Sequence, residues 1–471
     1  MNYWELRTIV SKVIPRMTQL HLSKRKADHV REKGRKSGYQ QFNLQKQKWE
    51  SLQRLLNTEQ VSSFVEVSLK AQACPMPLNL DCYDGLKCPY QCKYCFADSF
   101  RASLYTAFFD NSKTMGIRHC NPEYYKTELD KLFKVRGKDP HDLRNEIQRS
   151  VALEIPMRFG IRFEDFLPME ERKGISLQML QYLADANYPV MINTKSDLVG
   201  KPDYIDALQS NEGGAAVHVT MITSDEALCK KLEPGAPSFE RRIAGCKAMV
   251  DAGIRVVARI EPALFFLTDE PEHVEEYMKQ LKWAGIENIT FDTYSYSANN
   301  PGIRQNFVNL SLDFDRIFVT GCDSQALGSL LLEKFMDLFR EKGFSCSSFD
   351  LGNVPTNDQL ICCEVGDYYK ERGGGFNYGC AVVAARFIWQ KGRGGKPVRW
   401  SDFEKMVMKR GGFLSETLKE DVKALWNVAG NQAYSVNWAQ GVEPMGADED
   451  GIVWTYRYDI DFRTNILNAI Q

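Results

Sequence analysis

Residues 87–97, Lys87-Cys88-Pro89-Tyr90-Gln91-Cys92-Lys93-Tyr94-Cys95-Phe96-Ala97, contain three cysteines with the spacing C-x3-C-x2-C. A loop this short can turn three thiolates towards one point, and thiolates suit iron–sulfur clusters or zinc. Three ligands leave one iron of a four-iron cluster without a protein ligand, and an open position is typical of catalytic metal sites. A zinc knuckle completed by Cys82 is the alternative, although paired C-x2-C elements match this spacing poorly.

The motif, with the aromatic Phe96 directly after its last cysteine, resembles the radical S-adenosylmethionine (SAM) superfamily. The resemblance implies a [4Fe-4S] cluster held by Cys88, Cys92 and Cys95, with SAM chelating the fourth iron. It also implies a reducing partner such as flavodoxin or ferredoxin, and cleavage of SAM to methionine and a 5′-deoxyadenosyl radical. The cofactors carry the difficult chemistry, and the protein supplies placement and electrostatics.

The composition is that of a soluble globular enzyme. A chain of 471 residues is expected to fold into two or three units, and 44% hydrophobic and 26% charged residues are ordinary values. No apolar run approaches bilayer-spanning length and the N-terminus lacks a signal peptide, so we expect a cytoplasmic protein without a membrane segment. The 13 cysteines are better read as metal ligands and free thiols than as disulfides.

Charge is distributed unevenly along the chain. Residues 1–60 contain 13 Lys and Arg against 5 Asp and Glu, a net charge of +8, whereas the remainder carries −9. The basic residues concentrate in 24–36. A basic segment on an acidic body favours a nucleic-acid contact. A solvated helix followed by a loop is the alternative interpretation.

From residue 152 onwards, short apolar runs alternate with amphipathic segments of helical length. The predicted strands are 155–163, 189–194, 215–222, 254–260 and 288–293. The predicted helices between them are 176–186, 204–209, 238–252 and 272–284, and two more are predicted before them at 122–133 and 140–147. This alternation predicts an α/β fold of parallel βαβ units, and the resemblance implies the partial (β/α)6 TIM-like barrel of radical SAM enzymes.

Polar residues stand where the predicted strands end, at the edge that carries chemistry in such barrels. A lysine and hydroxyl groups suit the SAM carboxylate and ribose, so we expect ligand contacts there. The candidates are Gly160, Glu164, Lys195, Ser196, Thr220, Arg259 and Glu261. For any one of them, a surface ion pair is the alternative.

Three segments of the chain resemble the spore photoproduct lyase-like branch of this superfamily, also described as DNA repair photolyase-like. The resemblance covers roughly residues 80–300. The three segments are Asn193-Thr194-Lys195-Ser196, the stretch from Leu232 to Arg242, and Ala252-Gly253-Ile254. The second strand of radical SAM enzymes often carries a Gly-Gly-Glu motif that receives the SAM amino group. Residues 160–165 occupy that place here without matching the motif.

A second group of cysteines follows the predicted barrel. Cys346, Cys362, Cys363 and Cys380 fall within 35 residues among glycine-rich loops. Some relatives of this branch carry additional cysteines after the barrel, and the resemblance implies an auxiliary [4Fe-4S] cluster. Zinc, or buried thiols that pack as small hydrophobic groups, are the alternatives.

We expect four regions along the chain. They are a basic, mainly helical extension at 1–70, the barrel at 71–310, its completion with the second cysteine group at 311–390, and a small α/β region at 391–471. In the last region, helices predicted at 401–409 and 415–428 precede loops, and Trp400, Trp426, Trp438 and Trp454 are expected to build a small core.

The sequence therefore predicts a radical SAM enzyme that abstracts hydrogen from a substrate. Nucleic acid is favoured as the substrate by the resemblance and the basic segment. A peptide or small molecule is the alternative, because fold does not fix function. A zinc-stabilised nucleic-acid-binding module without catalysis is an alternative of a different class.

Overall fold

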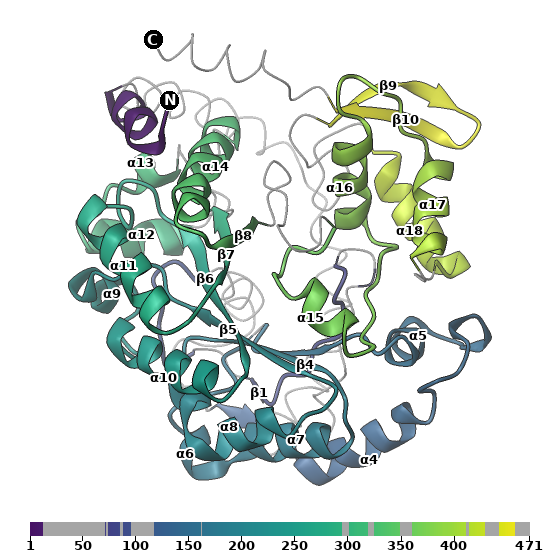
Figure 1. Cartoon of the computed structure of the whole chain (residues 1–471), viewed down its shortest axis with the longest axis horizontal. Helices are drawn as coiled ribbons and strands as arrows, with labels where there is room; N and C mark the ends of the chain where they lie inside the picture. Colours follow the sequence, from purple (N-terminus) through teal and green to yellow (C-terminus); the bar gives the residue numbers. More distant parts are fainter. Residues whose placement is uncertain are drawn as a thin grey trace.

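A computed structural model of the chain describes residues 1–12, 71, 74–84, 88–95, 117–161, 163–293, 301–318, 325–348, 360–410, 414–428 and 442–456 (Figure 1). The basic residues 24–36, Phe96 and Trp438 lie outside the described residues. Within the first segment, residues 3–12 are helical, and Tyr3, Leu6 and Val10 are buried against the rest of the chain. No helix in the described part of the chain is both long and apolar enough to cross a membrane.

Six parallel strands form the central sheet in the order of the sequence. They are β3 (Met157–Phe159), β4 (Val190–Thr194), β5 (Ala215–Thr220), β6 (Arg255–Ala263), β7 (Asn288–Thr293) and β8 (Ser345–Ser348). β3 and β8 are the two edges, so the sheet is an open, partial barrel. The predicted α/β class and the five predicted strands are confirmed. β8 was not predicted, because its sequence Ser-Cys-Ser-Ser contains no apolar run.

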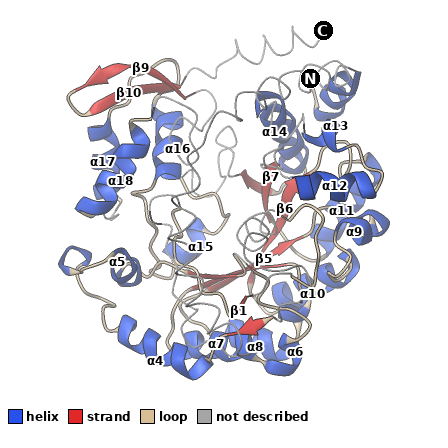
Figure 2. Cartoon of the chain, turned by 180° about the vertical axis from the view of Figure 1, so that it is seen from behind, coloured by secondary structure: helices blue, strands red, loops and turns tan. Residues whose placement is uncertain are grey.

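Helices cover the outer side of this sheet (Figures 1 and 2). They include α4 (Pro122–Phe133), α7 (Ile175–Asp185), α8 (Pro202–Gln209), α9 (Glu226–Leu232), α10 (Phe239–Asp251), α11 (Pro271–Trp283) and α14 (Gln325–Glu341). Ser238 caps α10 by accepting a hydrogen bond from the Arg241 backbone N–H, as the sequence predicted. The helix predicted at 140–147 is instead a short 3-10 turn, Pro140–Asp142, followed by α5 (Glu146–Ala152). The break is explained by Asn145, whose side chain caps α5.

The side chains of the sheet alternate between two chemically different faces. Val190 and Ile192 pack in the core shared with the helices, whereas Met191 between them packs with the C-terminal region. Ala216 and Val257 also pack with the C-terminal region. Strand neighbours in register share a face. The second face, called here the inner face, therefore carries these apolar residues and, on every strand, polar residues as well. Its polar residues are Arg158, Asn193, His218, Thr220, Arg255, Arg259, Glu261, Asn288, Thr290, Asp292, Ser345 and Ser347.

The C-terminal region lies over the inner face (Figure 1). It comprises α15 (Gly366–Lys370), α16 (Ala381–Lys391), α17 (Trp400–Lys409), α18 (Glu416–Trp426) and the hairpin of β9 (Val442–Asp448) and β10 (Gly451–Tyr456). Trp400, Trp426 and Trp454 are buried together in its core, as predicted. The hairpin replaces the predicted loops. β9 was missed because most of its residues are exposed and lack an alternating apolar pattern.

We predict that Gly160→Ala destabilises the fold strongly. Gly160 adopts φ +72°, and a Cβ built there lies 1.9 Å from the Asn193 carbonyl oxygen, so the backbone must shift. Gly253→Ala is the matched control, because Gly253 has φ +79° and open space around the added Cβ. We expect a loss of about 1 kcal/mol for the control from backbone strain and a clearly larger loss for Gly160→Ala in urea unfolding. Equal losses would contradict the proposed constraint.

Candidate active site

Two short turns shape the loop that carries the three-cysteine motif. The backbone N–H of Gln91 donates to the Cys88 carbonyl at 3.1 Å, and that of Cys95 donates to the Cys92 carbonyl at 3.1 Å. Gln91 has φ +50°, which reverses the chain between the first two cysteines. Cys92 is buried, whereas Cys88 and Cys95 are partly exposed. The loop therefore offers two of its thiols towards solvent and one towards the protein.

The segment after α9 clamps this loop in place. The Lys93 N–H donates to the Leu232 carbonyl at 2.8 Å, and the Gly235 N–H donates to the Tyr90 carbonyl at 3.1 Å. A Cβ on Gly235 would lie 2.1 Å from the Pro89 carbonyl oxygen, so only glycine allows this approach. Residues 232–242, which support the resemblance, therefore contact the cysteine loop directly. They fix the cysteine loop at the carboxyl edge of the sheet.

The three thiols are close enough to influence one another. Burial raises the pKa of Cys92, Cys95 and Cys88 raise it further, and the Lys195 ammonium opposes the rise. In the described part of the chain, no three His, Cys, Asp or Glu side chains are gathered in the arrangement of a metal centre. The donor set nevertheless fits an iron–sulfur cluster in number, softness and spacing.

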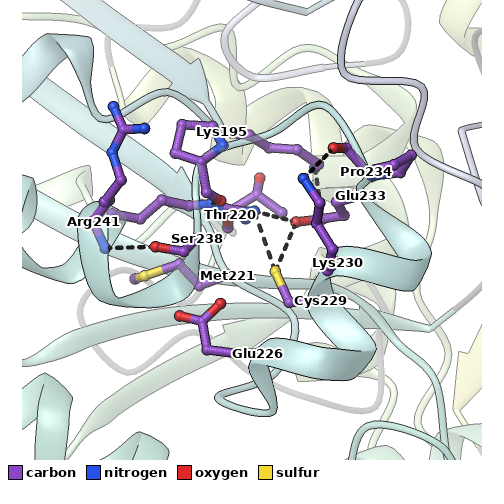
Figure 3. A network of polar contacts seen from close by, with 12 residues as sticks. Lys195, Thr220, Met221, Glu226, Cys229, Lys230, Glu233, Pro234, Ser238 and Arg241 are labelled. Carbon is purple, nitrogen blue, oxygen red and sulfur yellow. Dashed lines mark hydrogen bonds and ion pairs between the residues drawn. The ribbon is translucent and has the colours of Figure 1, made fainter.

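Glu233 belongs to a network of polar contacts (Figure 3). Its carboxylate accepts hydrogen bonds from the Tyr94 hydroxyl and from Arg242 Nη2, and all three side chains are buried. Burial alone would raise the pKa of Glu233, but Arg242 and Lys195 outweigh it and hold the pKa below its usual value. Cys229 completes the network, with its sulfur 3.6 Å from Glu233 and 3.4 Å from Arg242 Nη2.

Lys195 connects this network to the cysteine loop. Its Nζ lies 3.8 Å from Glu233 Oε1 and 5.5 Å from the centre of the Tyr94 ring. The side chain is about one sixth exposed, so it can still meet a ligand at the edge of the sheet. The structure therefore places Lys195 beside the three-cysteine loop, and its neighbours Ser196 and Glu164 also lie close enough to the loop to influence the pKa of Tyr90.

Glu164 and Ser196 shape the turn that carries Lys195. Glu164 accepts hydrogen bonds from Thr194 Oγ1 at 2.7 Å and from the Lys195 N–H at 3.0 Å. Burial raises the pKa of Glu164, and these donors oppose the rise. Ser196 is buried, and its Oγ accepts from the Leu198 N–H at 3.2 Å. Both side chains hold the turn, and so position Lys195.

Gly160 packs against the backbone of Asn193, at the end of β4. Its backbone N–H donates to Asp165, a residue that was not among the predicted site residues. Asp165 is fully buried and accepts hydrogen bonds from the backbone N–H groups of Gly160, Cys82 and Tyr83, at 2.8 to 3.0 Å. Asp165 thus ties the chain before the cysteine motif to the end of β3. Its position directly after a predicted strand could have marked Asp165 as a site residue. The sequence does not show, however, that three backbone N–H groups donate to its carboxylate.

The remaining strand-end candidates are also engaged within the protein. The Thr220 carbonyl accepts from Arg242 Nη1 at 2.8 Å, and Thr220 is buried. Arg259 donates to Glu261 from the same strand, and both side chains are about one quarter exposed. The charges of Arg259 and Glu261 therefore neutralise each other on the inner face.

The second cysteine group is only partly brought together. The sulfurs of Cys362 and Cys363 lie 3.9 Å apart. Burial raises the pKa of Cys380, and Cys74 and Cys362 raise it further, so these thiols lie within electrostatic range of one another. Cys346 lies apart, because it packs in the core between the sheet and the helices. The alternation of β8 puts it on the face opposite Ser347, whose Oγ donates to the Cys362 carbonyl at 2.7 Å.

Cys74 was not among the predicted ligands. It reaches the group because Ala71, Cys74 and Pro75 lie beside the loop before α16. The Asn377 side chain donates to the carbonyls of Ala71 and Cys74, and its backbone N–H donates to the Pro75 carbonyl at 2.8 Å. The sequence contains no spacing signal for this contact, because the two segments are about 300 positions apart.

No protein-family model matches the chain. Uncharacterised proteins from Mycobacterium bovis and Mycobacterium tuberculosis are 26% identical to it over 220 residues, or 47% of this chain. The match spans 59% of the relatives' own length.

Two solved structures with similar folds are spore photoproduct lyase complexed with dinucleoside spore photoproduct and SuiB of Streptococcus suis bound to S-adenosylmethionine. The first has a TM-score of 0.44 and 17% identity, covering 63% of this chain and 83% of that protein. The second has a TM-score of 0.38 and 14% identity, covering 59% of this chain and 50% of that protein.

We predict that Glu233→Gln destabilises the protein by about 3–5 kcal/mol, because it leaves the buried Arg242 without a counter-charge. Glu171→Gln is the control, since Glu171 pairs with Lys201 on the surface, and we expect little change. Urea unfolding at neutral pH measures both variants. A neutral effect of Glu233→Gln would mean that the buried pair does not hold the loop segment.

Proposed function

We propose that this chain is a radical SAM enzyme whose [4Fe-4S] cluster is held by Cys88, Cys92 and Cys95. The observation that carries the proposal is the anchored loop, which holds three soft donors at the carboxyl edge of a parallel sheet. When bound, the cluster and SAM supply a 5′-deoxyadenosyl radical, which abstracts hydrogen from the substrate. The chain's own residues position these groups and exclude water.

Lys195 has the central role among those residues. A cation beside Cys92 favours the thiolate form that ligates iron. Its partial exposure also suits a contact with the SAM carboxylate. Glu164, Ser196 and Gly160 act through the turn that orients it. Thr220 supplies the carbonyl that fixes Arg242. We propose Phe96, outside the described residues, as a further SAM contact.

We propose a second metal site formed by Cys74, Cys380 and one or both of Cys362 and Cys363. This set replaces Cys346 by Cys74, because Cys346 faces the outer core. Three or four soft donors suit an auxiliary [4Fe-4S] cluster. The C-terminal region would then carry a redox centre next to the inner face.

Two features bear on the substrate class, and they favour different substrates. The basic segment before residue 60 favours nucleic acid, in line with a photoproduct-lyase-like activity. The polar inner face, by contrast, favours a small molecule or peptide group that enters the barrel. A flavodoxin- or ferredoxin-like protein is the proposed source of the electron.

Cys92→Ala is expected to abolish 5′-deoxyadenosine formation, because the loop loses its one buried ligand. The assay is anaerobic reconstitution with iron and sulfide, reduction, addition of SAM, and quantification of deoxyadenosine by mass spectrometry. Cys246→Ala is the matched control, since Cys246 is a buried thiol in α10. We expect activity within a factor of about two. Retained deoxyadenosine in Cys92→Ala would refute the assignment, and a colourless protein that binds only zinc would favour the binding module.

Cys380→Ala is expected to lower the iron content of the reconstituted protein by one cluster, about four irons. Cys346→Ala is expected to leave it unchanged, because that thiol faces the opposite side of the sheet. Iron and sulfide analysis measures both variants. Unchanged iron in Cys380→Ala, or a loss in Cys346→Ala, would overturn the proposed ligand set.

A further inference from the structure

Several buried polar atoms on the inner face have no hydrogen-bond partner within the part of the chain that the structure describes. They are Arg158 Nε, Asn193 Nδ2, His218 Nε2 and Thr290 Oγ1, joined by Nε and Nη1 of Arg386 in α16. Each of these five side chains is more than nine-tenths buried. An unpaired buried donor is unfavourable by about 1–3 kcal/mol, and more for a charged group. Such a concentration is expected where a ligand supplies the missing hydrogen-bond partners.

The first four groups belong to adjacent strands of one face. Asn193 and His218 are paired in register across β4 and β5. Arg158 on β3 is paired with Met191, which precedes Asn193 by two residues and therefore shares its face. Thr290 lies on β7 of the same face. These side chains thus converge from the inner face of the barrel.

The fifth group approaches from the C-terminal region. Arg386 Nη2 donates to the Ser348 carbonyl, so its guanidinium lies at the end of β8. It is close enough to Cys362 to lower the pKa of that thiol, alongside the stronger effect of the hydrogen bond from Cys363. Arg158 acts in the same way on Cys363, and the Cys363 backbone hydrogen-bonds to the His218 ring. Residues 362–363 therefore connect Arg386 with the inner-face groups.

The charges in this space do not balance. Arg259 is paired with Glu261, and Arg255 with Asp367 at 3.1 Å. Asp292 is the other acidic residue among the inner-face polar residues of the strands. Neither Arg158 nor Arg386 forms an ion pair within the described ranges. Neither arginine therefore has a carboxylate ion-pair partner within the described ranges, and the other acidic groups of this region are the thiols of Cys362 and Cys363 and the buried Glu364, which accepts a hydrogen bond from Ser345.

We propose that this space binds an anionic group of the substrate, a carboxylate or a phosphate, through Arg158 and Arg386, with Asn193 as a neutral donor. Guanidinium groups recognise both anions through planar, paired hydrogen bonds. His218 Nε2 and Thr290 Oγ1 offer hydrogen bonds to a neighbouring hydroxyl. The inference rests on the proposed function, since it names the substrate chemistry of the same barrel.

The test is isothermal titration of the full-length, reconstituted protein with inorganic phosphate in one arm and succinate in the other, both with SAM at saturation. We expect one of the two anions to bind, and glycerol, a neutral probe, not to bind. Arg158→Gln should weaken the binding at least tenfold. Arg399→Gln is the control, because Arg399 pairs with Asp448 at the surface, and it should bind like the wild type.

Asn193→Asp is a second variant that keeps both arginines and adds a negative charge of the same size. It should also weaken anion binding at least tenfold, and it covers the case in which Arg158→Gln fails to fold. Absence of binding to both anions, or equal binding by Asn193→Asp and the wild type, would overturn the proposal. So would anion binding that appears only in a further titration without SAM, since the site would then be the SAM site itself. Deoxyadenosine formation without substrate is measured separately, so its loss would refute the radical SAM assignment and leave anion binding as an independent result.

Discussion

The alternation of side chains along six parallel strands determines where every chemical group of this protein can lie. Apolar residues such as Val190 and Ile192 face the helices, and the residues between them face inward. In a closed α/β barrel the inner residues fill a packed core. Here the sheet is open between β3 and β8, and the C-terminal region covers its inner side with both apolar and polar residues. The interior therefore contains charged groups that a closed apolar core could not accommodate.

The cysteine loop depends on a second, buried arrangement at the edge of this sheet. Glu233 and Arg242 are both removed from water, which is unfavourable for each charge taken alone. Their contact, together with the Tyr94 hydroxyl and the nearby Lys195, makes the arrangement acceptable and links the loop to β4, β5 and α10. A loop built only on exposed turns would have no such attachment. The position of the three thiols is thus set by electrostatics as much as by their spacing.

Local patterns predicted most of the fold, because apolar runs and helix caps act over a few residues. The five apolar strands and the Ser238 cap are examples. β8 was hidden because a strand that is buried by its neighbours does not need apolar residues of its own. The site was harder to predict. Polar residues at strand ends suggested ligand contacts, yet Glu164 and Thr220 are engaged with backbone and side-chain groups of the protein itself. Cys74 could not be found, since only folding brings it next to Cys380.

Polar groups with satisfied hydrogen bonds and polar groups without them lie in different parts of the barrel. Residues whose hydrogen bonds are complete, such as Glu164 and Asp165, fix the backbone at the carboxyl edge, where the cysteine loop sits. Residues whose hydrogen bonds are incomplete, such as Arg158 and Arg386, lie beside the second cysteine group. A protein tolerates buried, incomplete donors only where something else supplies the acceptors. The two cysteine groups therefore differ. The first is held by residues whose hydrogen bonds are satisfied within the protein, and the second borders the proposed anion-binding site.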